Sequence, residues 1–323
     1  MDDKAPPPKR LKQTTLSFSG CPTTKVGKEL LCTTIASALL DSATRLQLDM
    51  NKNRALGFDG ASNMAGSVKG ASSTIQEQFP KSVYFHCCNH CLDLCLQEIA
   101  REEKIIYDAL EHVRCLANFV RESGKRVSLY EEVCRELRAT VTDGTEFSQV
   151  QALCPTRWVV RVRALKCWRK NWKALHLMLE RISVDSSFTS DARSKASGFR
   201  KNMKKFRFYF AVRLAILLFE ECEIFSRNLQ RVNSAAVTIT SGAAMLISSL
   251  ESLRSELFLD RIFEECRHEA VILGVEEEAQ RERLQPRKLD EHPHTQHSFK
   301  PGESYRIQFF ACIDRMTASL RQR

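Results

Sequence analysis

The stretch at residues 55–64, Ala-Leu-Gly-Phe-Asp-Gly-Ala-Ser-Asn-Met, decides the predicted fold of the first part of the chain. Residues 55–58 are typical of a short buried strand, and residues 59–62 form a turn into a helix that we expect to reach Phe79. The stretch 83–85, Val-Tyr-Phe, predicts a second strand from its β-branched and aromatic content. Two strands joined by a helix predict a right-handed βαβ unit with parallel strands.

Helical periodicity dominates the remaining sequence. An amphipathic helix is predicted at residues 28–50 because apolar side chains recur at helical spacing, at Leu31, Ile35, Leu39 and Leu46. After residue 90 strand signals nearly vanish, and the spacing of apolar residues predicts helices at 92–137, 158–182, 206–232, 235–257 and 305–320. We therefore expect an α/β to mostly α fold, with polar breaks at 142–145, 183–190 and 285–302.

The composition bounds the classes of protein that fit. Of 323 residues, 43% are hydrophobic and 27% are charged, which is ordinary for a folded globular chain. The net charge of +10 favours polyanionic partners such as nucleic acid or acidic proteins. The 13 cysteines follow no small-domain disulfide framework and no secretory signal opens the chain, so we expect reduced, intracellular thiols. The longest apolar run is too short to span a bilayer, so no membrane partner is expected.

The first 26 residues are expected to form a disordered basic tail. Three prolines, Pro6, Pro7 and Pro8, precede the cluster Lys9-Arg10-Leu11-Lys12. Such a cluster on an extended segment fits a nuclear import signal, and a merely solvated tail explains it equally well.

The sharpest candidate for chemistry is Asp59, which the predicted strand places at its carboxyl end among small residues. Small neighbours would let a phosphate or a metal ion approach the carboxylate. The alternative is that Asp59 and Ser62 make the turn and cap the following helix, as most such residues do.

A second candidate is the pair Cys87 and His90, which has the two-residue gap of metal ligands. A closed zinc site needs four ligands, and no second pair with suitable spacing appears. Buried cysteines that act as small hydrophobic side chains are the competing interpretation.

The third candidate is a basic helical face after Thr156. Its apolar stripe consists of Leu165, Trp168, Trp172, Leu175 and Leu179, so Trp168 and Trp172 are expected in the core. The opposite side and its flanks carry Arg157, Arg161, Arg163, Lys166, Lys170 and Lys173. No acidic residue lies between 157 and 173, so this face is predicted to bind phosphates, with Trp158 stacking on an unpaired base.

Three stretches taken in order carry a resemblance to a known family. Residues 57–64, residues 84–94 and Thr156-Arg157-Trp158 resemble the core of the hAT-type transposases, and among them the branch that includes zinc finger MYM-type protein 1-like proteins. The likeness extends into residues 219–229 and 305–314. It implies a partial ribonuclease H-like βαβ core at 27–100, followed by a large helical insertion domain at 101–323.

The resemblance also implies roles for single residues. In that family an acidic triad holds divalent metal ions for strand cleavage and transfer. Asp59 resembles the second acidic residue, Cys87 and His90 match a Cys-x-x-His element beside the active site, and Trp158 matches a tryptophan that contacts the distorted DNA end.

The departures from the family pattern bear on catalysis. The first catalytic aspartate would lie on a strand before Lys28 and the third acidic residue beyond Arg323. We therefore expect Asp59 to be vestigial, the chain not to be an enzyme, and no cofactor to be needed. Mg²⁺ would bind only if another chain supplied the missing acidic residues.

These observations leave three hypotheses about function. The first is a transposase-derived nuclear protein, catalytically inactive, that binds DNA or chromatin-associated proteins through the basic helical face. The second is a helical protein–protein interaction module without DNA binding. The third is a fragment of an active DNA transposase.

Overall fold

The structure is a computed structural model, and it describes residues 25–66, 70–140, 147–153, 161–230, 236–276 and 301–323. The chain divides into two compact units, Met1–His90 and Cys91–Arg323, called the first unit and the second unit below. The described residues are mostly helical, with one small parallel sheet of two strands. This confirms the mostly α fold class that the sequence predicts.

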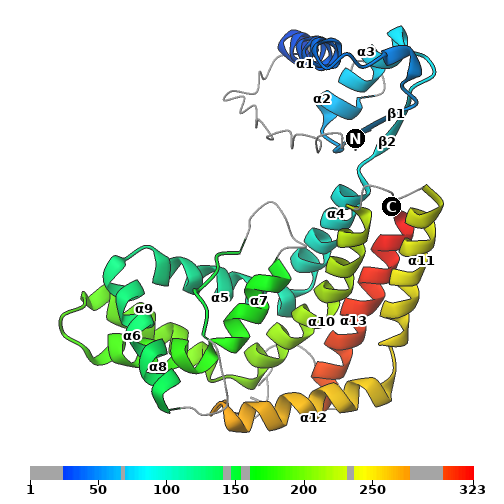
Figure 1. The fold of residues 1–323 in the computed structure, drawn as a ribbon. Helices are drawn as coiled ribbons and strands as arrows, with labels where there is room; N and C mark the ends of the chain where they lie inside the picture. The colour runs from blue at the N-terminus through cyan, green and yellow to red at the C-terminus, as the bar shows by residue number, and fades with distance from the viewer. Residues whose placement is uncertain (1–24, 67–69, 141–146, 154–160, 231–235, 277–300) are drawn as a thin grey trace, which may run out of the picture. The chain divides into compact units, whose positions relative to one another are not determined.

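The first unit has the element order that the sequence predicts around its two strands. Its elements are α1 (Lys25–Arg45), the 3-10 helix η1 (Met50–Lys52), β1 (Ala55–Phe58), α2 (Ser62–Ala65), α3 (Ala71–Gln78) and β2 (Val83–His86). The strands run parallel, with Ala55 opposite Val83 and Phe58 opposite His86. Figure 1 shows α1, in dark blue, lying beside α3.

The first unit has a small core on one face of its sheet. Its buried cluster is Ala36 from α1, Leu56 from β1, and Ala71 and Ile75 from α3. Side chains alternate along a strand, so the neighbours of Leu56 point to the opposite face. That face carries the exposed apolar side chains of Ala55, Val83 and Phe85.

Two helices of the first unit differ from prediction. The helix predicted at 28–50 exists as α1, but Leu39 and Leu46 of the expected stripe are 37% and 53% exposed. Cys32, Ala36 and Ala43 are buried instead, because small side chains let α1 pack closely on α3.

The helix predicted to run to Phe79 is two helices, α2 and α3, because Gly66 and Gly70 approach each other between them. The Gly70 amide donates to the Gly66 carbonyl at 2.9 Å. A Cβ at Gly70 would lie 2.5 Å from the Gly66 nitrogen, so only glycine allows this contact.

The named elements in the described part of the second unit are all helices. They are α4 (Cys88–Glu102, which begins in the first unit), α5 (Lys104–Arg121), α6 (Gly124–Thr140), α7 (Arg161–Lys170), α8 (Trp172–Val184), α9 (Ser190–Met203), α10 (Phe206–Leu229), α11 (Ala236–Ser252), α12 (Glu256–Ile272) and α13 (Pro301–Gln322). The boundary between the units falls ten residues before the predicted domain boundary at 100/101, since Leu92, Leu96 and Ile99 of α4 pack in the core of the second unit.

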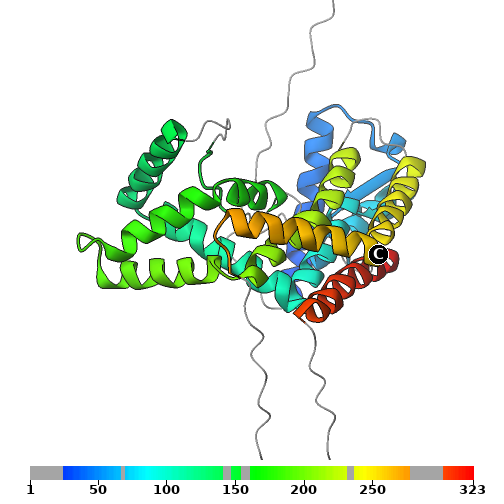
Figure 2. The ribbon, with the colours of Figure 1, turned by 90° about the horizontal axis from the view of Figure 1, so that it is seen from below.

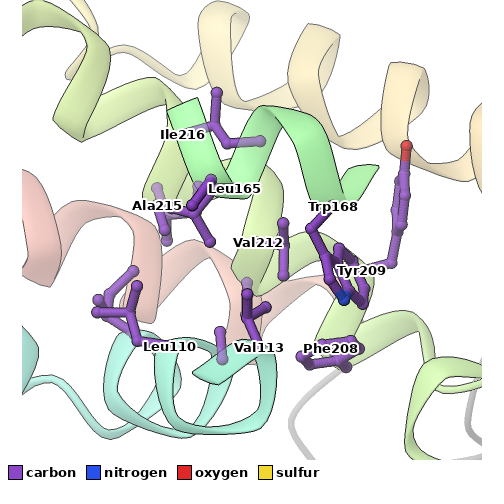
Figure 3. Close-up of a cluster of buried hydrophobic side chains, with 14 of the residues drawn as sticks. Leu110, Val113, Leu165, Trp168, Phe208, Tyr209, Val212, Ala215 and Ile216 are labelled. Atoms are coloured by element: carbon purple, nitrogen blue, oxygen red, sulfur yellow. The ribbon is translucent and has the colours of Figure 1, made fainter. Parts of the chain in front are cut away.

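Helix α10 is the centre of the second unit, because α5, α7, α9, α11 and α12 all pack on it. The turned view in Figure 2 shows α12, in orange, running across the second unit. Figure 3 shows where α5, α7 and α10 meet, with Val113, Trp168 and Val212 among the buried side chains. No helix in the described ranges is both long and apolar enough to cross a bilayer.

Two long helices that were predicted in the second unit are divided into shorter ones. The predicted helix 92–137 is α4, α5 and α6, and the predicted helix 158–182 is α7 and α8, because an apolar period continues across one-residue or two-residue breaks. Helices α9 and α12 were not expected. Apolar residues are sparse in α9, and in α12 charged residues interrupt the apolar ones. The breaks predicted at 142–145 and 285–302 lie wholly or largely outside the described residues.

Candidate nucleic-acid interface and strand-end loops

At the carboxyl ends of β1 and β2, the segment that starts at Asp59 and the segment that starts at Cys87 lie side by side. The amide of Cys87 donates to the carbonyl of Phe58 at 2.8 Å, so the chain leaving β2 stays beside the chain leaving β1. The His86 imidazole lies over Gly60, where any Cβ would overlap it. Asp59 is exposed at this edge.

Neither Asp59 nor Ser62 caps the helix that follows this turn, which was the alternative role considered for them. The N-cap position of α2 is Ala61, which makes no side-chain capping bond. Ser62 is the first residue inside α2 and Asp59 lies before the cap. The turn therefore depends on the small residues Gly60 and Ala61 and not on a polar cap.

Around Asp59 the described side chains do not gather into a metal site. Within the described ranges, no group of three or more His, Cys, Asp or Glu side chains is placed to hold a metal ion. A two-ion Mg²⁺ site shares several carboxylates between the ions, so Asp59 with these neighbours does not fit one.

Cys87 and His90 lie near the start of α4, next to His86. The rings of His86 and His90 are 6.0 Å apart between centroids, and the Cys87 side chain is half-buried. The described cysteines carry thiols and form no disulfide, and several, such as Cys222 and Cys266, are fully buried in the second unit. In the segment for which burial was the competing interpretation, Cys95 is buried, while Cys87, Cys88 and Cys91 are only partly buried.

The basic helical face exists on α7 and the start of α8. Arg163, Lys166, Lys170 and Lys173 are exposed, while Trp168 and Trp172 are 2% and 1% exposed, as the predicted core positions require. Lys166 forms an ion pair with Glu220. Among the described residues, Arg163, Lys170 and Lys173 have no carboxylate partner.

Three predicted members of this face, Arg161, Arg157 and Trp158, are either buried or outside the described residues. Arg161 is only 8% exposed, so its guanidinium is unavailable to phosphates; the helical period places it on the Leu165 and Trp168 side. Arg157 and Trp158 lie outside the described residues.

Asn171 sets the junction between α7 and α8. It is fully buried, and its side-chain amide exchanges two hydrogen bonds with the backbone of Ser148, at 3.1 and 3.0 Å. The backbone ladder continues through the junction, because the Asn171 amide donates to Cys167 and the Leu175 amide donates to Asn171. Lys170 and Lys173 therefore lie about one helical turn apart on a nearly continuous helical surface.

A pocket of about 690 Å³ lies beside this face, between α7, α8, α10 and α12. Lys166, Lys170 and Lys173 contribute to its lining. On the other side Glu269 receives hydrogen bonds from Arg169, at 2.5 Å, and from the Tyr209 hydroxyl. Burial, together with that bond to Glu269, raises the pKa of Tyr209.

No pattern in the sequence indicated this pocket. Its walls come from helices far apart in the chain, as the Arg169–Glu269 pair shows by joining residues 100 positions apart. Helix α12, which supplies Glu269, was itself not predicted. The cavity forms only when these helices pack together.

A smaller pocket of about 460 Å³ is lined by His112, between α5, α9 and α10. The His112 ring packs edge-on against Phe199 and Phe208, with centroids 5.3 and 4.4 Å away. Burial, and to a lesser degree the charge of Lys205, lower the pKa of His112 to about 4.

No protein-family model matches the chain, and no solved structure matches it.

Proposed function

We propose that this chain binds nucleic acid through the basic face of α7 and α8 and does not cleave DNA by itself. One observation carries the proposal: Arg163, Lys170 and Lys173 are exposed at helical spacing and no described carboxylate pairs with them. Unpaired cations of this kind bind phosphates and release condensed counterions. The resemblance of the sequence to hAT-type transposases supports a transposase-derived, nuclear protein.

The absence of cleavage is proposed on chemical grounds. Hydrolysis by two metal ions needs several carboxylate oxygens around the ions. Asp59 is the single candidate acid that the motif offers at the strand ends. Incubation of supercoiled DNA with the chain and Mg²⁺ should give no nicks. Nicking that disappears in Asp59→Asn would overturn this part of the proposal.

The binding experiment compares two triple variants at low salt. Replacing Arg163, Lys170 and Lys173 by alanine should weaken binding to labelled duplex DNA and lower the salt dependence by about one unit of slope for each lost phosphate contact. The matched control replaces one arginine and two lysines that are also exposed and have no carboxylate partner among the described residues, at Arg121, Lys81 and Lys201.

The two outcomes separate a local interface from general charge. A large loss in the first variant and a small one in the control supports the basic face. Equal losses in both variants, or no binding of DNA by the unmodified chain, would refute it.

Nuclear localisation is a separate part of the proposal and is supported by the basic cluster after Pro8. A fluorescent fusion should accumulate in nuclei, and alanine at Lys9, Arg10 and Lys12 should disperse it. Unchanged accumulation would exclude this cluster as the import signal.

A further inference from the structure

The pocket beside the basic face has an apolar interior that phosphate binding does not use. Its apolar lining residues are Leu137, Phe147, Trp172, Ile216, Ile272 and Leu273. Three of these six residues, Phe147, Trp172 and Ile216, are buried, whereas Ile272 at the end of α12 is 58% exposed. An accessible aliphatic side chain at the mouth of a cavity is a suitable contact for an apolar group of a partner.

The charges around the pocket do not cancel. Glu220 forms an ion pair with Lys166, and Glu269 forms one with Arg169. The Oε2 atom of Glu269 also lies 3.6 Å from Nε of Arg213. Lys170 and Lys173 line the same pocket and have no carboxylate partner among the described residues. Two positive charges therefore remain uncompensated at an apolar cavity, where they attract anionic groups.

We infer that this pocket binds an acidic segment of a partner protein that carries an apolar anchor side chain. The volume of about 690 Å³ is large enough for an aromatic or branched aliphatic side chain with its flanking backbone. The anchor contacts Ile272 and the partly buried Leu273, and carboxylates on either side of it pair with Lys170 and Lys173. Anchors in pockets supply most of the affinity of such interfaces, and charges at the rim guide association.

The lining fits a peptide better than a nucleotide. Among the described residues that line the pocket, no Asn, Gln, Ser or Thr occurs, and Glu220 and Glu269 are already engaged by Lys166 and Arg169, so the lining offers the edge of a base neither an amide nor an unpaired carboxylate. The aromatic rings present are those of Phe147, Trp172 and Tyr209, which are at most 6% exposed and offer little surface for a base to stack on.

This inference goes beyond DNA binding, although it uses two of the same lysines. The test therefore needs a residue that lines the pocket and carries no charge. Ile272 meets this condition, and Val271 is its matched control, since Val271 is 79% exposed on the same helix and does not line the pocket.

The probe is a labelled synthetic peptide in which a phenylalanine is flanked by glutamates, titrated into the full chain. Ile272→Ser should weaken its binding about fivefold, since part of an aliphatic contact is lost, whereas Val271→Ser should not change it. Replacing the phenylalanine of the peptide by serine should remove the difference between the unmodified chain and Ile272→Ser. Lys173→Glu should weaken binding, and a peptide with lysines in place of glutamates should recover affinity for that variant.

Single-stranded and duplex DNA are titrated into the same variants. Unchanged DNA binding in Ile272→Ser, together with weaker peptide binding, supports the inference. No binding of the peptide, or equal binding by Ile272→Ser and Val271→Ser, overturns it. Loss of single-stranded DNA binding in Ile272→Ser also overturns it, because the pocket would then hold a nucleotide. The proposed DNA interface fails separately, if alanine at Lys170 and Lys173 leaves DNA binding intact.

Discussion

The two units of the chain bury their apolar side chains to very different extents. In the first unit, one cluster of four buried residues, Ala36, Leu56, Ala71 and Ile75, lies between two helices and one face of a two-stranded sheet. In the second unit a single core extends through the helices from α4 to α13. Because stability grows with the apolar area removed from water, the second unit should be much the more stable of the two.

The sheet of the first unit shows what this difference means at the level of residues. Val83 and Phe85 are 64% and 49% exposed, although both are good strand formers. An isolated pair of strands is marginal in water unless other elements pack on it. By contrast, α10 in the second unit has apolar residues on nearly all sides and is covered by several helices. The described sheet therefore owes its order mainly to α1 and α3.

The largest predicted effect comes from a substitution in the core of the second unit. Trp172→Ala should lower the free energy of unfolding by about 3–5 kcal/mol, because it removes a fully buried aromatic side chain and leaves a cavity. Denaturant unfolding followed by circular dichroism measures the loss, and hydrogen exchange locates it. Amides of α7, α8 and α10 should exchange faster while those of β1 and β2 keep their rates.

The matched control for this prediction is Leu257→Ala on α12. Leu257 is 84% exposed, so its removal should change the free energy of unfolding by less than about 0.5 kcal/mol. Faster exchange of β1 and β2 in Trp172→Ala would contradict the picture of two units with separate cores.

The strands of the first unit and the tryptophans of the second were predictable because each depends on a local pattern. β-Branched and aromatic residues at 83–85 identify β2, and residues 55–58 identify β1, without knowledge of any partner. Trp168 and Trp172 belong to a helical stripe with Leu165 and Leu175, and that stripe is buried as expected.

Other features depend on contacts that no local pattern contains. The break between α2 and α3 follows from the approach of two glycine backbones, and a helical period cannot show it. Arg161 was assigned to the basic face by its charge, although its position in the helix turns it inward. The pocket requires α7 and α12 to meet, so its residues could not be recognised together.

A smaller predicted effect is the loss of stability of the second unit at acidic pH. The pKa of His112 is lowered to about 4 by burial and by Lys205, from an ordinary value near 6.5, so the folded state favours the neutral ring. A lowered pKa stabilises the fold above pH 6.5, and this stabilisation is lost as the pH falls from 6.5 towards 4. Between pH 7 and pH 5 the free energy of unfolding should therefore fall by about 2 kcal/mol from this group alone.

The variant His112→Leu sharpens this prediction because it removes the titrating group and keeps an apolar side chain between Phe199 and Phe208. Its stability should depend less on pH over this interval than that of the unmodified chain. His176, whose pKa is also lowered by burial and by Arg200 and Lys204, should leave some dependence in the variant. Identical slopes for both proteins would show that His112 is not held neutral by the fold.

The smallest effects come from one substitution made in each unit, glycine to alanine. Gly70→Ala should destabilise the first unit by roughly 1–2 kcal/mol, because its Cβ would lie 2.5 Å from the backbone nitrogen of Gly66, which cannot turn away as a side chain can. Gly198→Ala in the middle of α9 should stabilise the second unit by about 0.5–1 kcal/mol, since a Cβ there meets nothing within 4 Å and alanine favours the helix. Hydrogen exchange should show faster opening of β1 and β2 in the first variant and slower opening of α9 in the second. If Gly70→Ala leaves the exchange of both strands unchanged, the close contact between Gly66 and Gly70 does not hold the first unit together, and its order must come from elsewhere.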